Sequence, residues 1–401
     1  MASLIEQVLT LAGILVLGLM LALATLLLVQ TIAACMGKRP LPRVRATNAR
    51  PRIAVLIPAH NEVAGVAATL STVRSQLLPG DRLVVIADNC SDETAKAASA
   101  EGVEVIERHD TVLRGKGYAL DFGVRHLQLN PPDVVMMFDA DCVVGAGCVA
   151  TLAIEAEASR HPVQALYLIR AAHAGVLARL SEFAYRLRNW VRPIGMLRYG
   201  LPCQLMGSGM AFHWSLLTDV SLASGHLTED LQLGLAFARL GKFPRFCPTA
   251  TVDSLFVSDA DSATVQRTRW EHGHLGTIAA EWPGLAVRSL RSGDVRLAFM
   301  AWDLAIPPLA LFSTILLVAA VITGLLALSS VAWWPLVLVA LALAMLLVAI
   351  VLAQRNYARD LIKLREIFLA VPVYLIRKAP VYLRFMFQRQ VEWIRTKRDA
   401  G

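Results

Sequence analysis

The chain has 401 residues, of which 56% are hydrophobic and only 17% are charged, and its mean hydropathy is +0.53. Ordinary soluble domains carry roughly a quarter charged residues, so the composition excludes a purely soluble protein and indicates a membrane protein. The length still leaves room for a soluble domain beside the membrane spans.

The net charge of +8 is concentrated in two blocks. Residues 38–52 contain six Lys or Arg and no acid, and residues 354–401 contain eleven Lys or Arg against four acids. Both blocks flank apolar runs, where anionic headgroups attract each Lys or Arg by about 1 kcal/mol. The charge therefore predicts a lipid bilayer as partner and argues against nucleic acid. The six cysteines form no CxxC pair, which favours a reducing compartment.

The N-terminal region contains no charge between Glu6 and Lys38. A helix needs about 20 apolar residues to cross the hydrocarbon core, so we expect one transmembrane helix within residues 1–37. A basic juxtamembrane linker at residues 38–52 follows it.

The next region alternates short β-branched runs with stretches of helical pattern. The runs are 53–58, 82–87, 103–107 and 134–138, and the helical stretches include 62–77 and 116–128. This alternation predicts a parallel α/β sheet, in a domain that we place at residues 53–285.

Polar residues follow the predicted strands, and in an open α/β sheet ligands bind beyond the carboxyl ends of the strands. Asp139 and Asp141 are two positions apart, so both side chains can point the same way in an extended segment. Such a pair suits Mg²⁺ or Mn²⁺ with phosphate oxygens as further ligands. Two acids are also common in surface turns, so the pair alone is a weak signal.

A second uncharged stretch runs from Leu304 to Gln354 and is interrupted near Trp333 and Trp334. We expect an amphipathic segment and a transmembrane hairpin at residues 286–354. The positive-inside rule then predicts that the N-terminus lies outside, and that residues 38–303 and the tail lie inside.

The basic tail at residues 355–401 mixes aromatic residues with arginines, and Pro372 and Pro380 interrupt a single long helix. We expect short amphipathic helices in the headgroup plane. The alternative is a fourth, shallow span around residues 366–376.

Several motifs occur in a specific order and at specific separations. They are Val55-Leu56-Ile57-Pro58-Ala59-His60-Asn61-Glu62, Asp88, Arg114-Gly115-Lys116-Gly117, Asp139-Ala140-Asp141, Thr228-Glu229-Asp230 and Gln266-Arg267-Thr268-Arg269-Trp270. With these motifs, residues 53 to about 276 resemble family 2 glycosyltransferases of the GT-A fold, most closely the membrane-embedded group of cellulose, chitin-oligosaccharide and hyaluronan synthases. The resemblance implies a Rossmann-like cytosolic domain with a mixed, mainly parallel sheet, about three transmembrane helices and interfacial amphipathic helices.

The resemblance also implies roles for individual residues. Asp139 and Asp141 match the metal ligands, Asp230 matches the general base, and Gln266 and Arg269 match the groups that bind the diphosphate. The donor-binding positions are Pro58, His60, Glu62, Asp88, Lys116, Asp139, Ala140 and Arg269, and the acceptor-binding positions are Gly207, Ser208, Glu229 and Trp270. The family usually has a second acid after Asp88, and this chain has Asn89 there, so the nucleotide base is left unassigned.

Three features have a second interpretation. Thr228-Glu229-Asp230 also suits a helix start. His272 and His274 form an HxH pair that is either metal-binding or structural. The arginine-rich segment at residues 170–200 is either an interfacial helix or a solvated basic helix.

The predicted function is a membrane-bound, inverting hexosyltransferase that uses Mg²⁺ or Mn²⁺ and moves a sugar from a nucleotide-sugar donor, expected to be a UDP-sugar. The acceptor would be a lipid-linked or growing glycan in cell-envelope polysaccharide synthesis at the inner membrane of a bacterium. Three spans make a thin wall around a polar polymer, so the alternative of a processive synthase needs a homo-oligomer or a secretion or assembly subunit as partner. The sequence is also compatible with a ceramide-type lipid glucosyltransferase, and with an inactive scaffold or glycan-binding subunit.

Overall fold

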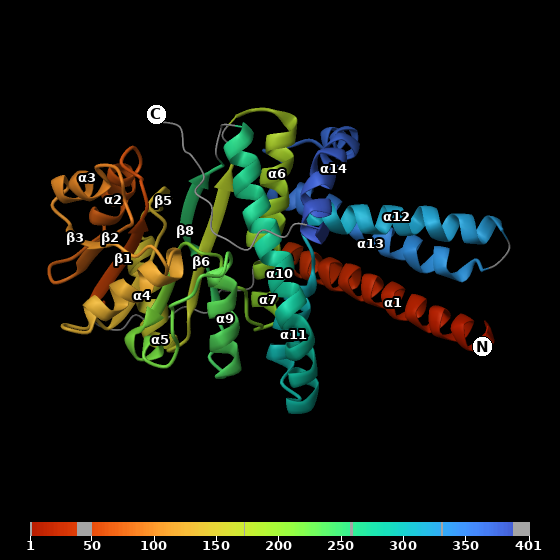
Figure 1. Ribbon diagram of the computed structural model, residues 1–401, viewed down its shortest axis with the longest axis horizontal. Coiled ribbons are helices and arrows are strands. Elements are labelled where there is room, and N and C mark those ends of the chain that lie inside the picture. The colour runs from red at the N-terminus through yellow and green to blue at the C-terminus, as the bar shows by residue number, and fades with distance from the viewer. Residues whose placement is uncertain (1, 38–49, 172, 257–259, 330–331, 388–401) are drawn as a thin grey trace.

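The computed structural model describes residues 2–37, 50–171, 173–256, 260–329 and 332–387. Most of the predicted linker at 38–52 and the end of the predicted tail therefore lie outside the described residues. Figure 1 shows a sheet domain at one end, three long helices that project from the other end, and a group of helices between them. This arrangement places the sheet beside a bundle of apolar helices.

One eight-stranded sheet lies in the described part of the chain, with the order β3-β2-β1-β4-β7-β6-β8-β5. The strands are β1 (Ile53–Ala59), β2 (Arg82–Asp88), β3 (Glu104–Arg108), β4 (Val134–Met137), β5 (Cys142–Val144), β6 (Val163–Arg170), β7 (Met210–His213) and β8 (Arg245–Leu255). The pairs β1–β2, β1–β4, β2–β3 and β6–β8 are parallel, and the pairs that involve β7 or β5 are antiparallel. The prediction of a mixed, mainly parallel sheet is confirmed.

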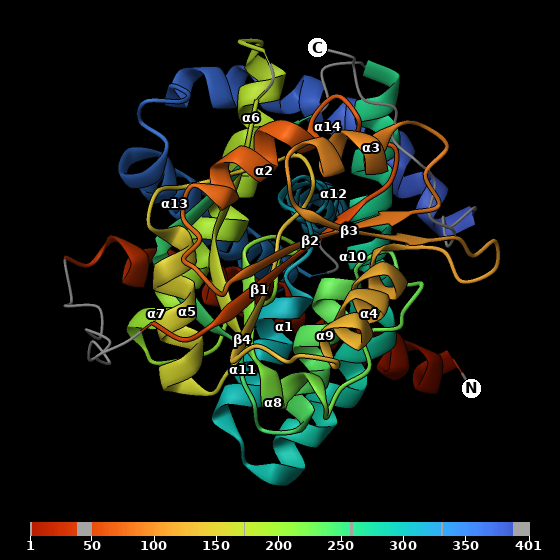
Figure 2. The same cartoon turned by 90° about the vertical axis from the view of Figure 1, so that its left-hand side faces the viewer.

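Helices cover both faces of the sheet, as the end-on view in Figure 2 shows. Ile53, Val55 and Ile57 of β1 pack on the face covered by α2, α3 and α5, and Ala54 and Leu56 pack on the face covered by α4, α8 and α9. These helices are α2 (Val66–Arg74), α3 (Thr94–Ala100), α4 (Lys116–Leu127), α5 (Cys148–Ser159), α8 (Trp214–Leu217) and α9 (Glu229–Arg239). Because successive strand residues point to opposite faces, a strand between two layers is apolar throughout, as β1 is.

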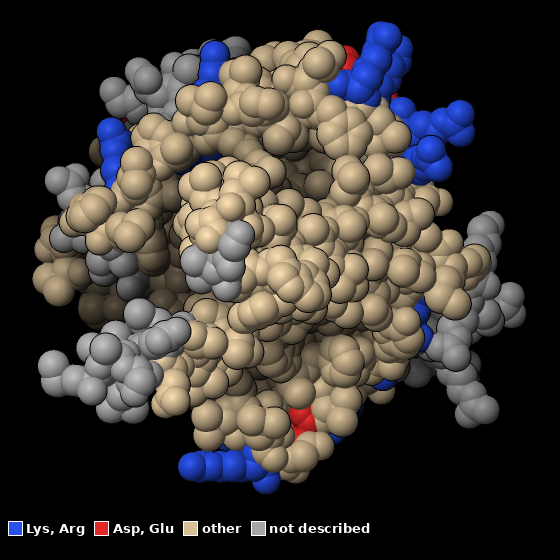
Figure 3. All heavy atoms as spheres, turned by 90° about the vertical axis from the view of Figure 1, so that its right-hand side faces the viewer, with Lys and Arg blue, Asp and Glu red and all other residues tan. Residues whose placement is uncertain are grey.

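The three long apolar helices are α1 (Ala2–Cys35), α12 (Leu309–Leu328) and α13 (Trp334–Tyr357). Each is long and apolar enough to cross a membrane, over Thr10–Cys35, Leu309–Leu328 and Trp334–Tyr357. Figure 3 looks at the face formed by their free ends, where the centre is uncharged and Lys and Arg lie mainly at the rim. The three predicted spans are therefore present as candidate spans.

The group of helices between the sheet and the spans consists of α6 (Val176–Arg186), a π-helical turn (Leu187–Val191), α7 (Arg192–Arg198), α10 (Ala260–Ser292) and α11 (Val295–Ala305). The helix α10 carries the segment Gln266–Trp270 and runs through position 285, where we placed the end of the sheet domain. The sheet domain thus joins the helical group through a continuous helix.

The tail differs from the prediction, because α14 (Leu364–Phe387) is one helix that contains both Pro372 and Pro380. A proline inside a helix removes one hydrogen bond and commonly kinks the helix, so tertiary contacts must offset this loss. Ile367, Tyr374 and Val381 pack into the core of the spans, and Lys378 forms a buried ion pair with Glu271 of α10. These contacts hold the helix together where its sequence predicts breaks.

The arginines of the predicted basic segment are mostly paired, which agrees with neither of the two interpretations of residues 170–200. Arg179 pairs with Glu366, Arg186 with Glu182 and Asp360, Arg192 with Asp303, and Arg170 with Asp253, while Arg198 donates to the carbonyls of Ala34 and Gly37. Arg186 and Arg192 are buried. Arg170 joins β6 to β8, and the other four arginines join α6 and α7 to α1, α11, α14 and the segment after α13. They do not form an exposed basic face.

Candidate active site

A cavity of about 220 Å³ lies at the carboxyl ends of β1, β2 and β4, between the sheet and the helices α9 and α10. It is lined by the residues that the sequence singled out, with one exception. They are Pro58, His60, Glu62, Asp88, Arg114, Lys116, Asp139, Ala140, Asp141, Gly207, Glu229, Asp230, Gln266, Arg269 and Trp270. Segments up to about 200 positions apart in the sequence therefore meet in one site.

The exception is Ser208, which is fully buried and does not line the cavity. Its hydroxyl oxygen accepts a hydrogen bond from the backbone N–H of Asp139 at 3.1 Å. Ser208 thus lies behind the wall of the site, where it fixes the backbone of the acidic segment.

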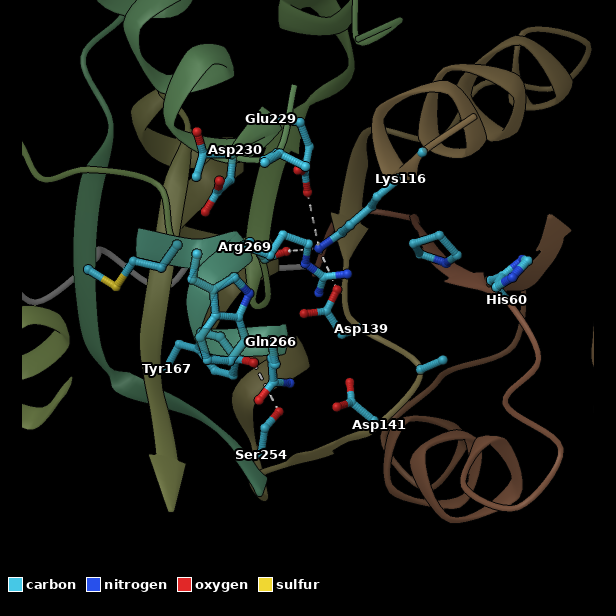
Figure 4. A pocket seen from close by; sticks show the side chains of 18 of the residues that line it. His60, Lys116, Asp139, Asp141, Tyr167, Glu229, Asp230, Ser254, Gln266 and Arg269 are labelled. Carbon is cyan, nitrogen blue, oxygen red and sulfur yellow. Dashed lines mark hydrogen bonds and ion pairs between the residues drawn. The ribbon is translucent and has the colours of Figure 1, made fainter. Parts of the chain in front are cut away.

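Asp139 and Asp141 follow β4 and point into the cavity (Figure 4). The ammonium group of Lys116, at the start of α4, contacts the carboxylate of Asp139 and donates to the carbonyl oxygen of Gly207 at 2.7 Å. Lys116 also lies 3.7 Å from Glu229. One cation therefore joins the acids that follow β4 to the acids that begin α9.

The side chain of Asp88, at the end of β2, is only 10% exposed. Its carboxylate accepts hydrogen bonds from Arg108 at 2.6 Å and from the side-chain amide of Asn89 at 3.1 Å. The backbone carbonyl oxygen of Asp88 accepts a hydrogen bond from Nδ1 of His60 at 2.7 Å. Asn89 has a φ of 53°, a left-handed conformation that asparagine adopts more readily than most residues. The asparagine that replaces the usual acid thus shapes the turn and holds Asp88.

Glu229 and Asp230 are the first two residues of α9, and both also line the cavity. Both interpretations of the Thr228-Glu229-Asp230 motif therefore hold for its position in the structure. Burial raises the pKa of Glu229 to about 7, against the opposing effect of Lys116. Burial also raises the pKa of Asp230, while Lys116 and Arg188 act to lower it. The two carboxyl groups therefore titrate closer to neutral pH than exposed acids, which titrate near pH 4.

Gly207 lies against these acids with a φ of +90°, in the left-handed region that favours glycine. A Cβ atom at this position would lie 3.4 Å from Oδ2 of Asp230. Glycine lets the backbone pass close to the carboxylate, and its carbonyl oxygen is then in place to accept from Lys116.

Gln266, Arg269 and Trp270 reach the cavity from α10. The indole ring of Trp270 packs against Tyr185 and Phe256, with ring centroids 5.6 and 6.3 Å away. Figure 4 shows Arg269 pointing to the same part of the cavity as Lys116 and Asp139. The cavity therefore has a cationic and acidic side next to the sheet and an aromatic side next to the helices.

Several residues of the site belong to no motif in the sequence. Arg108 at the end of β3 was detectable, because it follows a strand in the same way as Asp88. Tyr167 and Ser254, whose hydroxyl groups are 3.0 Å apart, lie on β6 and β8, and Arg188 and Asn189 lie on the π-helical turn. No local pattern predicts that these residues reach the site, because their positions depend on how distant elements pack.

The acids fit a divalent cation whose other ligands come from a substrate. No group of three or more His, Cys, Asp or Glu side chains in the described part of the chain could hold a metal ion on its own. Asp139 and Asp141 nevertheless line the same cavity of about 220 Å³, which has space for an ion and a substrate. Mg²⁺ is commonly held by one or two carboxylates together with substrate phosphates.

The two histidines of the HxH pair have protein contacts. A ring nitrogen of His272 lies 2.8 Å from the carbonyl oxygen of Val381. Burial, assisted by Arg188 and Arg192, holds the pKa of His274 well below its usual value. His272 connects α10 to α14, and His274 is a neutral residue of the interior.

The fold and the cavity define an α/β domain with a polar cavity at the carboxyl ends of its strands, joined to candidate membrane helices. The model of the family described as "Glycosyltransferase like family 2" matches residues 51–273, which is more than half of the chain. The chain belongs to this family.

One of two curated relatives carries a glycosyltransferase name. The chain is 27% identical to the probable glycosyltransferase YdaM of Bacillus subtilis (strain 168) over 243 residues, which cover 56% of this chain and 55% of the relative. It is 34% identical to the uncharacterized protein MJ1222 of Methanocaldococcus jannaschii over 92 residues, 23% of this chain and 36% of that protein. The chain thus spans about half the length, or less, of these curated relatives.

A solved structure shows the same fold. It is the mannosyltransferase PcManGT from Pyrobaculum calidifontis in complex with GDP-Man and Mn²⁺, with a TM-score of 0.56 and 18% identity over 92% of this chain and 100% of that chain. The predicted GT-A fold is therefore confirmed.

Proposed function

We propose that this protein is a membrane-bound, inverting glycosyltransferase that moves a sugar from a nucleotide-sugar to a lipid-linked or growing glycan acceptor. The observation that carries the proposal is the single cavity in which Asp139, Asp141, Asp230 and Arg269 meet. The site contains both kinds of group that the reaction needs, namely groups for an anionic leaving diphosphate and a carboxylate for the acceptor hydroxyl.

In this proposal, the donor diphosphate binds between Arg269 and the acids that follow β4. Arginine offers a planar fork of donors that suits phosphate oxygens, and Gln266 and Trp270 come to the site on the same helix. A divalent cation bound by Asp139 and Asp141 would supply positive charge to the leaving diphosphate. Mn²⁺ accompanies GDP-Man in the mannosyltransferase complex of similar fold, which supports Mg²⁺ or Mn²⁺ as cofactor here.

Asp230 is the proposed general base. A carboxylate beside the acceptor takes the proton of the attacking hydroxyl group as the oxygen bonds to the anomeric carbon. The bond from that carbon to the diphosphate oxygen breaks in the same displacement, so the anomeric configuration inverts. The raised pKa of Asp230 makes it a stronger base than an exposed aspartate.

The acceptor is proposed to approach from the aromatic side formed by Tyr185 and Trp270, next to the helices that contact the candidate spans. Figure 1 shows that the beginning of α1, the end of α12 and the beginning of α13 lie at the end far from the sheet. In the sequence the basic blocks follow α1 and α13, so the positive-inside rule favours a catalytic domain on the cytoplasmic side of a bacterial inner membrane. This location suits a role in cell-envelope polysaccharide synthesis.

The test is donor turnover by the protein in lipid nanodiscs with Mg²⁺ or Mn²⁺, using a panel of UDP-sugars and GDP-mannose. We expect nucleotide release from at least one donor, and a product that contains the transferred sugar when a lipid extract is added. No release from any donor, with the protein folded, would contradict the proposal.

A further inference from the structure

A second cavity of about 60 Å³ adjoins the candidate active site on the side of the spans. Tyr185, Arg188 and Trp270 line both cavities. Much of the remaining wall of the second cavity is apolar and comes from α1, α12, α14 and the segment that precedes α12. These residues are Leu27, Ile306, Pro308, Leu309, Phe312 and Tyr374. A single layer of side chains therefore separates the active site from an apolar space among the spans.

The charged groups of the second cavity have protein partners, with one exception. Arg192 pairs with Asp303 at 2.8 Å, and Glu271 pairs with Lys378. Within the described ranges, Arg188 makes no hydrogen bond or ion pair with a protein group, and its guanidinium group lies 5.9 Å from the ring centroid of Tyr185. The donors of Arg188 are thus available to a ligand at the junction of the two cavities.

The position of Arg188 depends on the π-helical turn Leu187–Val191. Such turns are rare and occur frequently at functional sites. The other five arginines between residues 170 and 198 are all held by a protein carboxylate or carbonyl group. Among the residues that the structure describes, Arg188 therefore differs from the rest of its segment both in backbone conformation and in having no such partner.

We propose that the second cavity binds the beginning of the alkyl chain of an amphiphilic acceptor, and that Arg188 binds the phosphate group at the head of this chain. This inference rests on the proposed function and identifies the acceptor as a lipid-linked glycan whose lipid carries the phosphate group, so that a sugar hydroxyl group remains to give its proton to Asp230. Arginine binds phosphate oxygens through two parallel N–H donors, and the apolar wall excludes water from the chain. Because Arg188 and Asp230 both line the first cavity, the bound phosphate would lie on the base side of the active site.

The inference is tested by photo-crosslinking in nanodiscs of zwitterionic lipid. The probe is a monoalkyl phosphate that carries a diazirine in its chain, and the matching alkyl alcohol is the comparison. We expect labelled peptides from α1, α12 and α14, at least tenfold less labelling with the alcohol, and at least tenfold less in Arg188→Gln. Arg188→Lys, which keeps the charge and loses the planar fork, should give an intermediate result.

The matched control is Arg359→Gln, because Arg359 is an exposed arginine that does not line the second cavity. Its labelling should equal that of the original protein. Equal labelling of Arg188→Gln, or labelling confined to the outer faces of α12 and α13, would overturn the inference. Complete competition by millimolar inorganic phosphate would also overturn it, since the site would then recognise free phosphate without the chain.

Donor turnover on the same preparations separates the two proposals. Labelling that depends on Arg188, without turnover of any donor, would contradict the proposed function and support the lipid-phosphate site. Turnover without labelling that depends on Arg188 would overturn the site and leave the transferase activity in place.

Discussion

The ammonium group of Lys116 lies 3.7 Å from the carboxylate of Glu229 and also contacts the carboxylate of Asp139. These acids belong to two motifs about 90 positions apart, one on the proposed donor side and the other beside the proposed base. A change in the charge of Lys116 must therefore affect both sides of the site.

The first prediction concerns the pH dependence of transfer. Burial raises the pKa of Glu229 to about 7 and raises that of Asp230, and a protonated carboxyl group cannot accept the acceptor's proton. The plot of rate against pH should therefore have an acid limb near neutrality, well above the pH of about 4 at which exposed acids titrate. Because Lys116 lowers both pKa values, Lys116→Met should move the limb to higher pH.

The measurement is kcat/KM from pH 5 to pH 9. Lys96→Met is the control, since the side chain of Lys96 is 83% exposed and pairs with Glu93 on the surface, and its profile should be unchanged. An acid limb near pH 4 in every variant would show that the buried acids do not control the rate.

The second prediction concerns the metal. Asp141→Ala should weaken binding of the nucleotide-sugar in the presence of Mn²⁺ by about 10- to 100-fold, since a hydrogen bond or contact with a charged group contributes roughly 1.5–3 kcal/mol. Calorimetry with and without Mn²⁺ tests this, and the variant should bind the donor equally in both conditions. Donor binding that remains strengthened by Mn²⁺ would remove Asp141 from the metal site.

The third prediction concerns the contact between α7 and α1. A Cβ atom on Gly195 would lie 2.1 Å from the carbonyl oxygen of Gln30, and a backbone atom cannot move aside as a side chain can. Gly195→Ala should lower the free energy of unfolding by about 1–3 kcal/mol, the usual cost of overpacking. Thermal unfolding in one detergent measures this effect.

The control is Gly18→Ala on α1, where an added Cβ meets nothing within 4 Å. This substitution should keep the unfolding temperature unchanged or raise it slightly, because alanine has a higher helix propensity than glycine. Equal effects of the two substitutions would show that the close contact of Gly195 does not stabilise the protein.

Parts of the fold with strong local patterns were predictable from the sequence. Short apolar runs between helical stretches were enough to predict β1, β2 and β4, which are buried on both faces. The length of the uncharged runs was enough to predict α1, α12 and α13. The motif residues also met in one cavity as expected, since the ends of neighbouring strands share an edge of the sheet.

Other parts depended on contacts between distant residues. Pro372 and Pro380 predicted breaks in the tail, but the pair of Lys378 with Glu271 and the packing of Tyr374 keep α14 helical. The burial of Ser208 behind Asp139 and the exposure of Arg188 to two cavities likewise arise from tertiary packing. Such features have no signal in a local stretch of sequence.

The most direct test of the account compares Asp230→Asn with the original protein in nanodiscs, measuring sugar transfer and donor binding separately. The substitution keeps the size of the side chain and removes its ability to take a proton, so transfer should fall by about 10²- to 10⁴-fold while the Kd of the donor changes little. Transfer at the original rate by a folded Asp230→Asn protein would contradict the assignment of Asp230 as the base and, with it, the proposed arrangement of the site.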